Sequence, residues 1–293
     1  MTDISPDSRH PIVVVAGPTA VGKTRLGIEL AKRFDGEVIN ADSRYLYRGM
    51  DIGVAKPSLS ERDSVPHHLI DVRDPGEEMT LAAFQELAYA AINAVVEGWR
   101  IPRVPPDPAF RAELEREIRE SGLEVVAARL AAVDPNIAAR SGKNARRVIR
   151  ALEIHHATGL PMSEIEGKGP PPYRALEIGL TMPRAQLHAA IDARVEGQIA
   201  AGLVDEVAGL LAAGVAPDAP SMSSIGYRQL APHLQGTESL SDAVHRIKVD
   251  THRYVRHQET WLRKNPRLIP VSVVEPDWIE RSARLVSEFL SDN

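Results

Sequence analysis

Gly17-Pro-Thr-Ala-Val-Gly22-Lys23-Thr24 matches the phosphate-binding loop pattern G-x-x-x-x-G-K-S/T at every required position. An apolar run at residues 12–16 precedes this stretch, and apolar residues recur at helical spacing behind it. Backbone N–H groups, the positive end of a helix dipole and the Lys23 ammonium would surround phosphate oxygens there, and Thr24 would place its hydroxyl on Mg²⁺. We predict a diphosphate-binding loop formed by Gly17, Pro18, Thr19, Ala20, Val21, Gly22, Lys23 and Thr24.

The composition of the whole chain limits the class of protein. With 293 residues, 43% of them hydrophobic, the chain is long enough for one large domain or two smaller ones. No uncharged apolar run approaches the roughly 20 residues that span a bilayer, and residues 1–10 lack the pattern of a secretion signal. The absence of cysteine excludes disulfides and fits a cytoplasmic location. Since the net charge is −5, contact with nucleic acid must come from local basic patches.

A second strand is expected at Val38-Ile39, and it ends at Asn40-Ala-Asp42-Ser43. In an open parallel sheet the ligand crevice lies beyond the carboxyl ends of the strands, so Asp42 would project beside the phosphate loop. That position makes Asp42 a candidate general base or a carboxylate next to a metal ion. The alternative, an aspartate that only caps the following turn, is equally compatible with the sequence.

Helical patterns dominate the middle of the chain. Asp107-Pro108 and Asp134-Pro135 each combine a capping residue with a first-turn proline. They predict helices over residues 109–133 and from residue 135 to about residue 158, where Gly159 would end the second helix. These helices suggest an insertion between two parts of an α/β domain.

We therefore predict a P-loop NTPase-like core with a parallel sheet, formed by residues 1–105 and 173–293, and a helical insertion at residues 106–172. The expected strands of the core are residues 12–16, 38–39, 176–182 and 267–273. The insertion carries five basic residues without an acid in eleven positions, a pattern that by itself is usual for a solvated helix face: Arg140, Lys143, Arg146, Arg147 and Arg150.

Two long helices are expected in the last third of the chain. Pro183 opens an amphipathic pattern that continues through about Leu211. A second helix, at residues 239–264, mixes basic residues with Tyr254 and Trp261. Such mixing suits contacts with an RNA backbone and unstacked bases, although Trp261 could equally belong to the core.

Seven segments follow one another in the order that is characteristic of one enzyme family. They are Ala16-Gly-Pro-Thr-Ala-Val-Gly-Lys-Thr24, Ala41-Asp-Ser-Arg44, Tyr47-Arg-Gly-Met-Asp-Ile-Gly53, Ala55-Lys-Pro57, Pro66-His-His-Leu-Ile-Asp71, Ser221-Met-Ser-Ser-Ile-Gly-Tyr-Arg228 and Gln258-Glu-Thr-Trp261. With them the chain resembles the tRNA dimethylallyltransferase (tRNA isopentenyltransferase) family. The phosphate loop is common to many enzymes, whereas Asp-Ser-Arg followed by Tyr-Arg-Gly-Met-Asp-Ile-Gly is specific.

The resemblance implies transfer of a dimethylallyl group from its diphosphate to N6 of the adenosine 3′ of the anticodon in tRNA. The phosphate loop would then hold the leaving diphosphate with Mg²⁺, and no phosphoryl group would be transferred. By the same resemblance, Asp42 is the general base, and Lys23 and Arg228 join it as catalytic residues. The target base would flip into the pocket. The positions that match tRNA-contacting regions are Asp42, Ser43, Arg44, Tyr45, Asn144, Arg146, Arg147, Arg150, Gly226, Tyr227 and Arg228.

One segment that is usual in the family has no counterpart in this chain. Between the helix ending near Val95 and Pro106, the family normally has a buried strand, a Gly-Gly-Thr turn and the start of a helix. No Gly-Gly-Thr occurs here, and Pro102 and Arg103 suit a buried strand poorly. We expect a deletion of roughly 20 to 30 residues, about one strand and helix, and an activity impaired by it.

Two other functions remain open from the sequence. A P-loop kinase for a small molecule would share residues 17–24 but would not explain residues 221–228 or the basic insertion. A catalytically dead tRNA-binding protein would keep affinity for tRNA without turnover. A free nucleotide is a further possible acceptor, although the arginines of the insertion favour the anticodon stem-loop. We expect a monomer without membrane contact.

Overall fold

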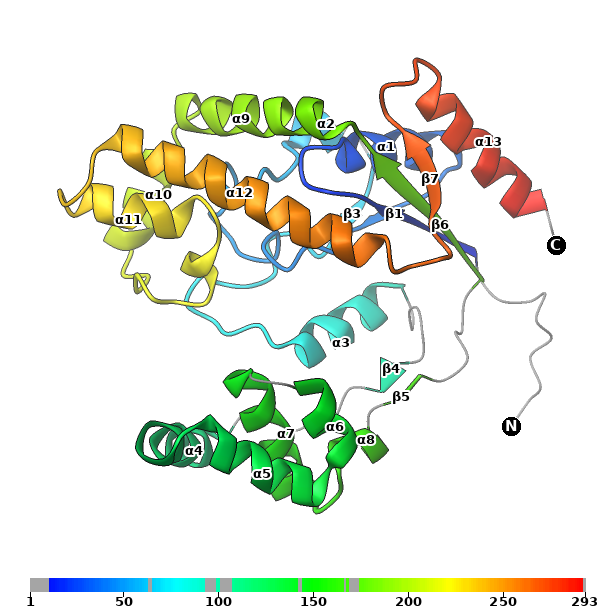
Figure 1. Cartoon of the computed structure of the whole chain (residues 1–293). Coiled ribbons are helices and arrows are strands. Elements are labelled where there is room, and N and C mark those ends of the chain that lie inside the picture. The colour runs from blue at the N-terminus through cyan, green and yellow to red at the C-terminus, as the bar shows by residue number, and fades with distance from the viewer. Residues whose placement is uncertain are drawn as a thin grey trace. The chain divides into compact units, whose positions relative to one another are not determined.

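The computed structural model (Figure 1) describes residues 11–62, 65–92, 99–100, 107–141, 144–165, 167–168 and 174–291. The chain divides into two compact units. The larger unit consists of Met1–Ala94 and Tyr173–Asn293, and the smaller unit is Val95–Pro172. Among the described residues, no helix has both the length and the apolar character needed to cross a membrane.

Parallel strands form the centre of the larger unit. β1 (Pro11–Ala16), β6 (Arg174–Thr181) and β7 (Ile269–Ser272) form one sheet in the order β1-β6-β7. Both neighbouring pairs are parallel, and Val15 of β1 lies opposite Ile178 of β6. The predicted α/β class with a parallel sheet is therefore confirmed.

Two further strand pairs are short. β2 (Val38–Ile39) pairs in parallel with β3 (His67–His68). In the smaller unit, β4 (Trp99–Arg100) pairs in antiparallel fashion with β5 (Gly167–Lys168). Asn40 and Asp42 thus follow directly after a strand, as the sequence predicted.

Helix α1 (Lys23–Arg33) starts at the end of the phosphate loop and packs against both β1 and β2. Helix α13 (Trp278–Ser291), which the sequence analysis did not predict, packs against α1, β6 and β7 (Figure 1). A bidentate ion pair joins the two helices, with Arg33 nitrogens 2.7 Å from the Glu280 carboxylate oxygens. The C-terminal helix therefore helps to hold the helix that begins at the phosphate loop.

The helix expected from Pro183 to Leu211 is two helices, so this prediction was wrong in its detail. α9 (Arg184–Ala200) ends before Gly202, and α10 (Leu203–Ala212) begins after it. Gly202 has φ of 98°, a left-handed conformation that interrupts a right-handed helix and that glycine adopts readily. The apolar periodicity continues across the break, which is why the sequence indicated one helix.

Helix α12 (Leu240–Leu262) confirms the second long helix and runs alongside α9 (Figure 1). The Ser239 hydroxyl caps it by accepting the backbone N–H of Asp242 at 3.1 Å. Helix α11 (Tyr227–Leu234) packs against α12 and was not predicted. The Gly226–Arg228 motif therefore forms the start of a helix.

The remaining elements of the larger unit are α2 (Leu59–Arg62), α3 (Leu81–Ile92) and the 3₁₀ turn η2 (Ser221–Ser223). The Thr80 hydroxyl caps α3 by accepting the backbone N–H of Ala83 at 3.1 Å. The main core of this unit joins side chains from the sheet and from α1, α9, α10, α11, α12 and α13.

The smaller unit consists mainly of helices, as predicted. They are α4 (Pro108–Ser121), α5 (Leu123–Val133), α6 (Pro135–Ser141), α7 (Ala145–Thr158) and α8 (Met162–Ile165). The helix expected over residues 109–133 is broken at Gly122, which has φ of 88°. The helix expected from residue 135 to about residue 158 is also two helices, α6 and α7, because Asn144 has an extended backbone and caps α7. Asp107 caps α4 by accepting the N–H groups of Ala109 and Phe110, as its position before Pro108 indicated.

Candidate functional site

A cavity of about 410 Å³ lies in the larger unit beside the phosphate loop. Its walls come from the loop, from the segment after β2, from α9, from the start of α11 and from α12. The polar and charged lining residues are Thr19, Asp42, Arg44, Arg194, Gln198, Ser223, Ser224, Arg228, Asp250, Thr251, Arg253, Tyr254 and His257. Four of the predicted catalytic and binding positions of this unit therefore line one cavity: Thr19, Asp42, Arg44 and Arg228.

The glycines of the phosphate loop hold it in a conformation that other residues would strain. A Cβ at Gly17, where φ is 154°, would lie 2.8 Å from Val21 Cγ1 and 3.0 Å from the Leu180 carbonyl oxygen. Gly22 has φ of 101° and precedes the first residue of α1. The Thr19 backbone N–H donates to Gln258 Oε1 at 3.0 Å, so α12 fixes the loop from the opposite wall.

Lys23 lies folded onto the loop. Its ammonium donates to the carbonyl oxygens of Gly17 and Pro18 at 3.0 and 2.9 Å. Burial and the like charge of Arg194 lower the pKa of Lys23 from 10.5 to about 8, although the charge of Asp42 opposes this shift. An anion that entered the cavity would relieve both unfavourable effects.

Arg194 is a second cation at this site, and the sequence analysis did not identify it. Its guanidinium donates to the Val54 carbonyl oxygen at 3.3 Å, and within the described residues it forms no salt bridge with a carboxylate. Burial lowers the pKa of Arg194, while Tyr45 and Asp42 favour its charged form. Two half-buried cations close together, Lys23 and Arg194, create a preference for an anion between them.

Asp42 combines both of the roles that the sequence left open. Its Oδ1 accepts the backbone N–H of Arg44 at 2.9 Å, which is the turn-capping role. Asp42 also lines the cavity, which is the placement expected of a catalytic carboxylate. Buried Asn40 fixes its backbone, because the amide of Asn40 bonds both the N–H and the C=O of Asp42, at 2.8 and 2.7 Å.

Thr24 and Tyr45 interact directly. Their side chains are hydrogen-bonded, and the Tyr45 hydroxyl donates to the Ala55 carbonyl oxygen at 2.7 Å. Burial, followed by the charge of Asp42, raises the pKa of Tyr45, so its hydroxyl stays protonated at neutral pH. Tyr45 therefore connects the predicted Mg²⁺ ligand to the segment that contains Ala55.

The loop at residues 51–53 is held by polar side chains that the sequence analysis did not identify. The Glu206 carboxylate accepts the three backbone N–H groups of this loop at 2.8 to 3.1 Å. It also accepts the Tyr227 hydroxyl at 2.5 Å, and Tyr227 is 0% exposed. The Gln198 amide donates to the carbonyl oxygens of Ile52 and Gly53 at 2.7 and 2.9 Å. The structural role of Tyr227 is thus to support this loop.

Arg228 is exposed and lies at the edge of the cavity, where it is paired with an acid. Its guanidinium lies 3.1 Å from Asp250 Oδ2, which also accepts the Gln229 amide at 2.7 Å. Burial raises the pKa of Asp250, but these bonds outweigh that effect and lower it below its usual range. Of the neighbouring predicted residues, Gly226 is buried and Ser43 is exposed.

Helix α12 presents aromatic and basic side chains beside the cavity. Trp261 is 68% exposed, so the alternative that it belongs to the core is wrong. Tyr254, which lines the cavity, is 49% exposed. Their spacing of seven residues places both on one face of the helix.

In the smaller unit, the predicted tRNA-binding residues fall into two groups. Asn144 caps α7 by accepting the backbone N–H of Arg147, and Arg146 and Arg147 are exposed. Arg150 instead bonds the fully buried carboxylate of Glu153, which Arg111 also contacts, at 2.7 and 3.0 Å. Arg150 therefore has a structural role within the unit.

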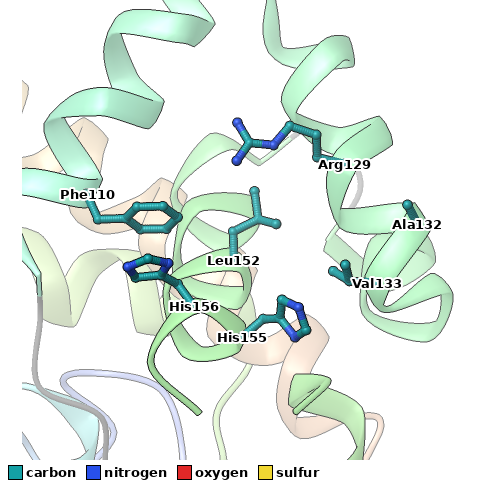
Figure 2. Close-up of a pocket in the computed structure, with 7 residues that line it drawn as sticks. All are labelled: Phe110, Arg129, Ala132, Val133, Leu152, His155 and His156. Carbon is teal, nitrogen blue, oxygen red and sulfur yellow. The ribbon is translucent and has the colours of Figure 1, made fainter. Parts of the chain in front are cut away.

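A second cavity, of about 350 Å³, lies within the smaller unit (Figure 2). The ring of Phe110 stacks on His156 with centroids 4.2 Å apart, and Leu152 and Val133 form apolar walls. No carboxylate is among its described lining residues, so this cavity lacks a candidate general base. The cavity beside the phosphate loop is therefore the candidate active site.

Comparisons with known proteins identify the family of the chain. A family model described as IPP transferase matches residues 45–102 and 91–265. The tRNA dimethylallyltransferase of Thermomicrobium roseum is 50% identical over 307 aligned residues, which cover 98% of this chain and 93% of that protein.

Solved structures of similar enzymes also match this chain over nearly its whole length. The tRNA isopentenylpyrophosphate transferase of Bacillus halodurans matches with a TM-score of 0.70 and 35% identity, covering 97% of this chain and 98% of that one. A eukaryotic dimethylallyltransferase acting on tRNA matches with a TM-score of 0.78 and 25% identity, covering 97% of this chain and 80% of that one.

Proposed function

This chain belongs to the IPP transferase family, and we propose that the site beside its phosphate loop transfers a dimethylallyl group from dimethylallyl diphosphate to tRNA. The acceptor atom is N6 of the adenosine on the 3′ side of the anticodon. One observation carries the proposal: Asp42 and the half-buried Arg194 line one cavity, and both interact electrostatically with the half-buried ammonium of Lys23. The reaction needs a carboxylate that accepts a proton and a group of cations that binds the leaving diphosphate.

The leaving diphosphate binds to this group of cations. Backbone N–H groups at the N-terminus of α1, the Lys23 ammonium and the Arg194 guanidinium surround it. Lys23 exchanges its bonds with the Gly17 and Pro18 carbonyl oxygens for bonds with the ligand. Because both cations lie in a partly desolvated cavity, they stabilise the charge that develops on the leaving oxygen more strongly than they would in water.

Asp42 serves the acceptor. The lone pair of N6 forms a bond to C1 of the dimethylallyl group, the bond from C1 to the diphosphate oxygen breaks, and the diphosphate leaves with that electron pair. Asp42 takes the proton that N6 loses. The hydrogen bonds from Asn40 hold the backbone of Asp42 in place throughout.

Mg²⁺ fits the donor groups on this side of the cavity. The Thr24 hydroxyl and the Asp42 carboxylate are hard oxygen ligands, and Mg²⁺ usually takes only one or two protein ligands and completes its shell with phosphate oxygens and water. When bound, the ion would neutralise charge on the diphosphate. Thr24 would hold it, and Tyr45 would orient the Thr24 hydroxyl through their hydrogen bond.

The RNA partner is an anticodon stem-loop. Arg228, Arg253 and Tyr254 line the cavity, and Trp261 continues the same face of α12 away from it. Exposed aromatic rings next to cations suit unstacked bases and phosphates. Exposed Arg146 and Arg147 supply further phosphate contacts from the insertion.

We also propose that this chain lacks about 20 residues in the region of residue 100. The two matches to the family model overlap at residues 91–102, as expected when a segment of the model is missing from the chain. The alignment to the Thermomicrobium roseum enzyme is 307 residues long, which exceeds the 293 residues of this chain. The expected Gly-Gly-Thr turn and its strand would lie in this segment, and their absence lowers the activity.

A single-turnover assay tests the function. Purified protein, Mg²⁺ and radiolabelled dimethylallyl diphosphate are mixed with an unmodified anticodon stem-loop, and label on the RNA is followed. We expect transfer that Asp42→Ala abolishes. Binding of the stem-loop without any transfer would instead indicate an impaired tRNA-binding relative, and phosphorylation of a small molecule by ATP would indicate a kinase.

A further inference from the structure

Gln258 of α12 connects this helix directly to the phosphate loop. It belongs to the segment Gln258-Glu-Thr-Trp261, whose first residue has no role in the proposed function. The Gln258 side chain is half-buried, and its Oε1 accepts the backbone N–H of Thr19 at 3.0 Å. The bond joins residues that lie 239 positions apart in the chain, so the fold as a whole places this amide on the loop.

The Gln258 amide has a second partner, the side chain of Tyr254, to which it is hydrogen-bonded. Tyr254 lies four residues earlier on α12, a spacing that makes two side chains neighbours on a helix. Burial, followed by the charge of Asp42, raises the pKa of Tyr254, whereas the bond from Gln258 lowers it. A bond that lowers the pKa of a phenol stabilises its charged form, so the Gln258 amide N–H donates and the Tyr254 oxygen accepts.

Both partners of Gln258 line the cavity beside the phosphate loop. Thr19 belongs to the loop that holds the leaving diphosphate in the proposed reaction. Tyr254 is half-exposed, and its hydroxyl lies close enough to Asp42 and Arg44 for their charges to act on it. Gln258 therefore bridges the part of the site that binds the prenyl donor and the part that receives the acceptor base.

The backbone of the phosphate loop is strained next to the bond with Gln258. Ala20 has φ of 65°, a left-handed conformation that is unfavourable for a residue other than glycine. Such a conformation persists only when surrounding contacts hold it, and the bond on the neighbouring Thr19 N–H is one of these contacts. Since N–H groups of the loop bind phosphate oxygens only in its compact conformation, losing this bond weakens the binding of an anion.

We propose that Gln258 is a positioning residue that aligns the two substrates. Its amide oxygen holds the phosphate loop through Thr19, and its amide nitrogen holds the ring of Tyr254, so the diphosphate and the acceptor base keep a fixed separation. The inference rests on the proposed function, which assigns the two substrates to these two sides of the cavity. It has a specific consequence: a change at Tyr254 alters diphosphate binding only while Gln258 is present.

A double-mutant cycle on the full-length chain tests this coupling. Calorimetric titration with inorganic pyrophosphate and Mg²⁺ compares the natural chain with Tyr254→Phe, Gln258→Met and the variant that carries both changes. The first change keeps the ring and removes the hydroxyl, and the second keeps the length of the side chain and removes both hydrogen-bonding groups. From the usual net effect of a hydrogen bond, we expect Gln258→Met to weaken binding about 3- to 10-fold and Tyr254→Phe about twofold. Tyr254→Phe should have no further effect when Gln258→Met is present.

The NMR resonance of the Thr19 amide proton gives a readout that a general loss of stability would not reproduce. Its chemical shift reports the hydrogen bond with Gln258, so Gln258→Met should move it upfield. Tyr254→Phe should move it in the same direction by a smaller amount, because this change frees the other end of the Gln258 amide. An unmoved Thr19 resonance in both variants would overturn the proposal.

Thr260→Val is the matched control on the same helix. The Thr260 hydroxyl bonds within its own helical segment, to the Arg256 carbonyl oxygen and the Arg263 guanidinium. Its removal should leave both the affinity for pyrophosphate and the Thr19 resonance unchanged. A loss of affinity equal to that in Gln258→Met would contradict a specific contact between α12 and the loop.

Two further results of the cycle would overturn the proposal. Equal losses from Tyr254→Phe with and without Gln258→Met would mean that Tyr254 acts independently of Gln258. Tighter binding of pyrophosphate by Gln258→Met would mean that Gln258 competes with the diphosphate for the Thr19 N–H. None of these measurements involves RNA or prenyl transfer, so their failure leaves the proposed function untouched, and a chain without prenyl transfer could still show the coupling.

Discussion

Arg194 is the residue whose role follows most directly from its surroundings. Its charge is partly desolvated, and within the described residues it has no carboxylate in a salt bridge. We expect Arg194→Ala to lower the single-turnover rate by about 10²- to 10³-fold, the usual effect of removing one donor to developing negative charge. Arg184→Ala is the matched control, because Arg184 lies on the same helix and only pairs with Glu259 at the surface. An equal loss in both variants would contradict the assignment.

Lys23 makes anion binding depend on pH. Its pKa of about 8 means that the ammonium is charged at pH 7 and mostly neutral at pH 9. Bound diphosphate favours the charged form, so affinity for inorganic pyrophosphate should fall as pH rises through 8. Calorimetric titration between pH 7 and 9.5 measures this fall. Lys23→Met should remove this fall in affinity near pH 8 and leave only the pH dependence that comes from the titration of pyrophosphate itself. An unchanged fall in the variant would contradict the role given to Lys23.

The residues at the site differ in how far the sequence could predict them. The phosphate loop and Asp42 were predictable from local signals. A sequence motif indicates the loop, and the end of the preceding strand indicates Asp42. Arg194 and Gln198 were not identified, since their contacts come from segments about 140 residues away. One signal was present: helical spacing places both on the same stripe as Leu187 and Ile191, which are buried.

At the scale of elements, the loop at residues 51–53 shows how packing constrains the site. A Cβ at Gly53 would lie 2.4 Å from Tyr227 Cε2 and 2.8 Å from Leu203 Cδ1. We expect Gly53→Ala to lower the free energy of unfolding by about 1–3 kcal/mol through overpacking. Urea denaturation measures the change. Gly76→Ala, where nothing lies within 4 Å of the added Cβ, should have little effect, and equal effects in the two variants would argue against the packing explanation.

In the smaller unit, buried Glu153 joins Asp107, Arg111 and Arg150. Burial raises the pKa of Glu153, but the hydrogen bonds from both arginines outweigh this effect and lower it. Its stabilisation is therefore complete above the ordinary Glu pKa of about 4.3 and is lost as pH falls through the lower folded-state pKa.

We expect Glu153→Gln to destabilise this unit by about 2–3 kcal/mol at pH 7, because it removes the charge between two arginines. Hydrogen exchange of the α7 amides measures the effect. The difference between the variant and the natural chain should shrink in acid, and a difference that persists at the lowest pH would contradict the ionic explanation.

The helices and strands were predictable where periodicity and capping residues coincide, as at Ser239 and Asp107. The breaks at Gly122 and Gly202 were missed, because the apolar pattern continues across them while the glycine conformation does not. Helix α13 was missed although its apolar face packs on α1, β6 and β7. Its packing partners lie far away in the sequence, where local propensity carries little information.

At the scale of the whole molecule, tRNA binding should be electrostatic and distributed. The protein carries a net charge of −5, so local cations such as Arg146 and Arg147 must provide the phosphate contacts. We expect Arg146→Ala with Arg147→Ala to weaken binding of the stem-loop and to reduce the slope of log affinity against log salt by about 1 to 2. Arg116→Ala with Arg119→Ala, two exposed arginines elsewhere in the same unit, is the control. Equal changes in slope would contradict a specific RNA surface.

The α/β class and the helical character of the insertion could be predicted from the sequence, because phosphate loop, strands and caps are local signals. The split between the sheet of β1, β6 and β7 and the pair of β2 and β3 could not, since strand pairing depends on contacts between distant segments. The predicted deletion near residue 100 lies outside the described residues and stays a prediction from the sequence.

The most direct measurement of the central claim is the identity of the product. An unmodified anticodon stem-loop is incubated with stoichiometric protein, Mg²⁺ and dimethylallyl diphosphate, then digested and analysed by mass spectrometry. We expect one dimethylallyl group on N6 of the adenosine 3′ of the anticodon, and none with Asp42→Ala. An unmodified adenosine after many half-times of a related enzyme, with the stem-loop still bound, would contradict it.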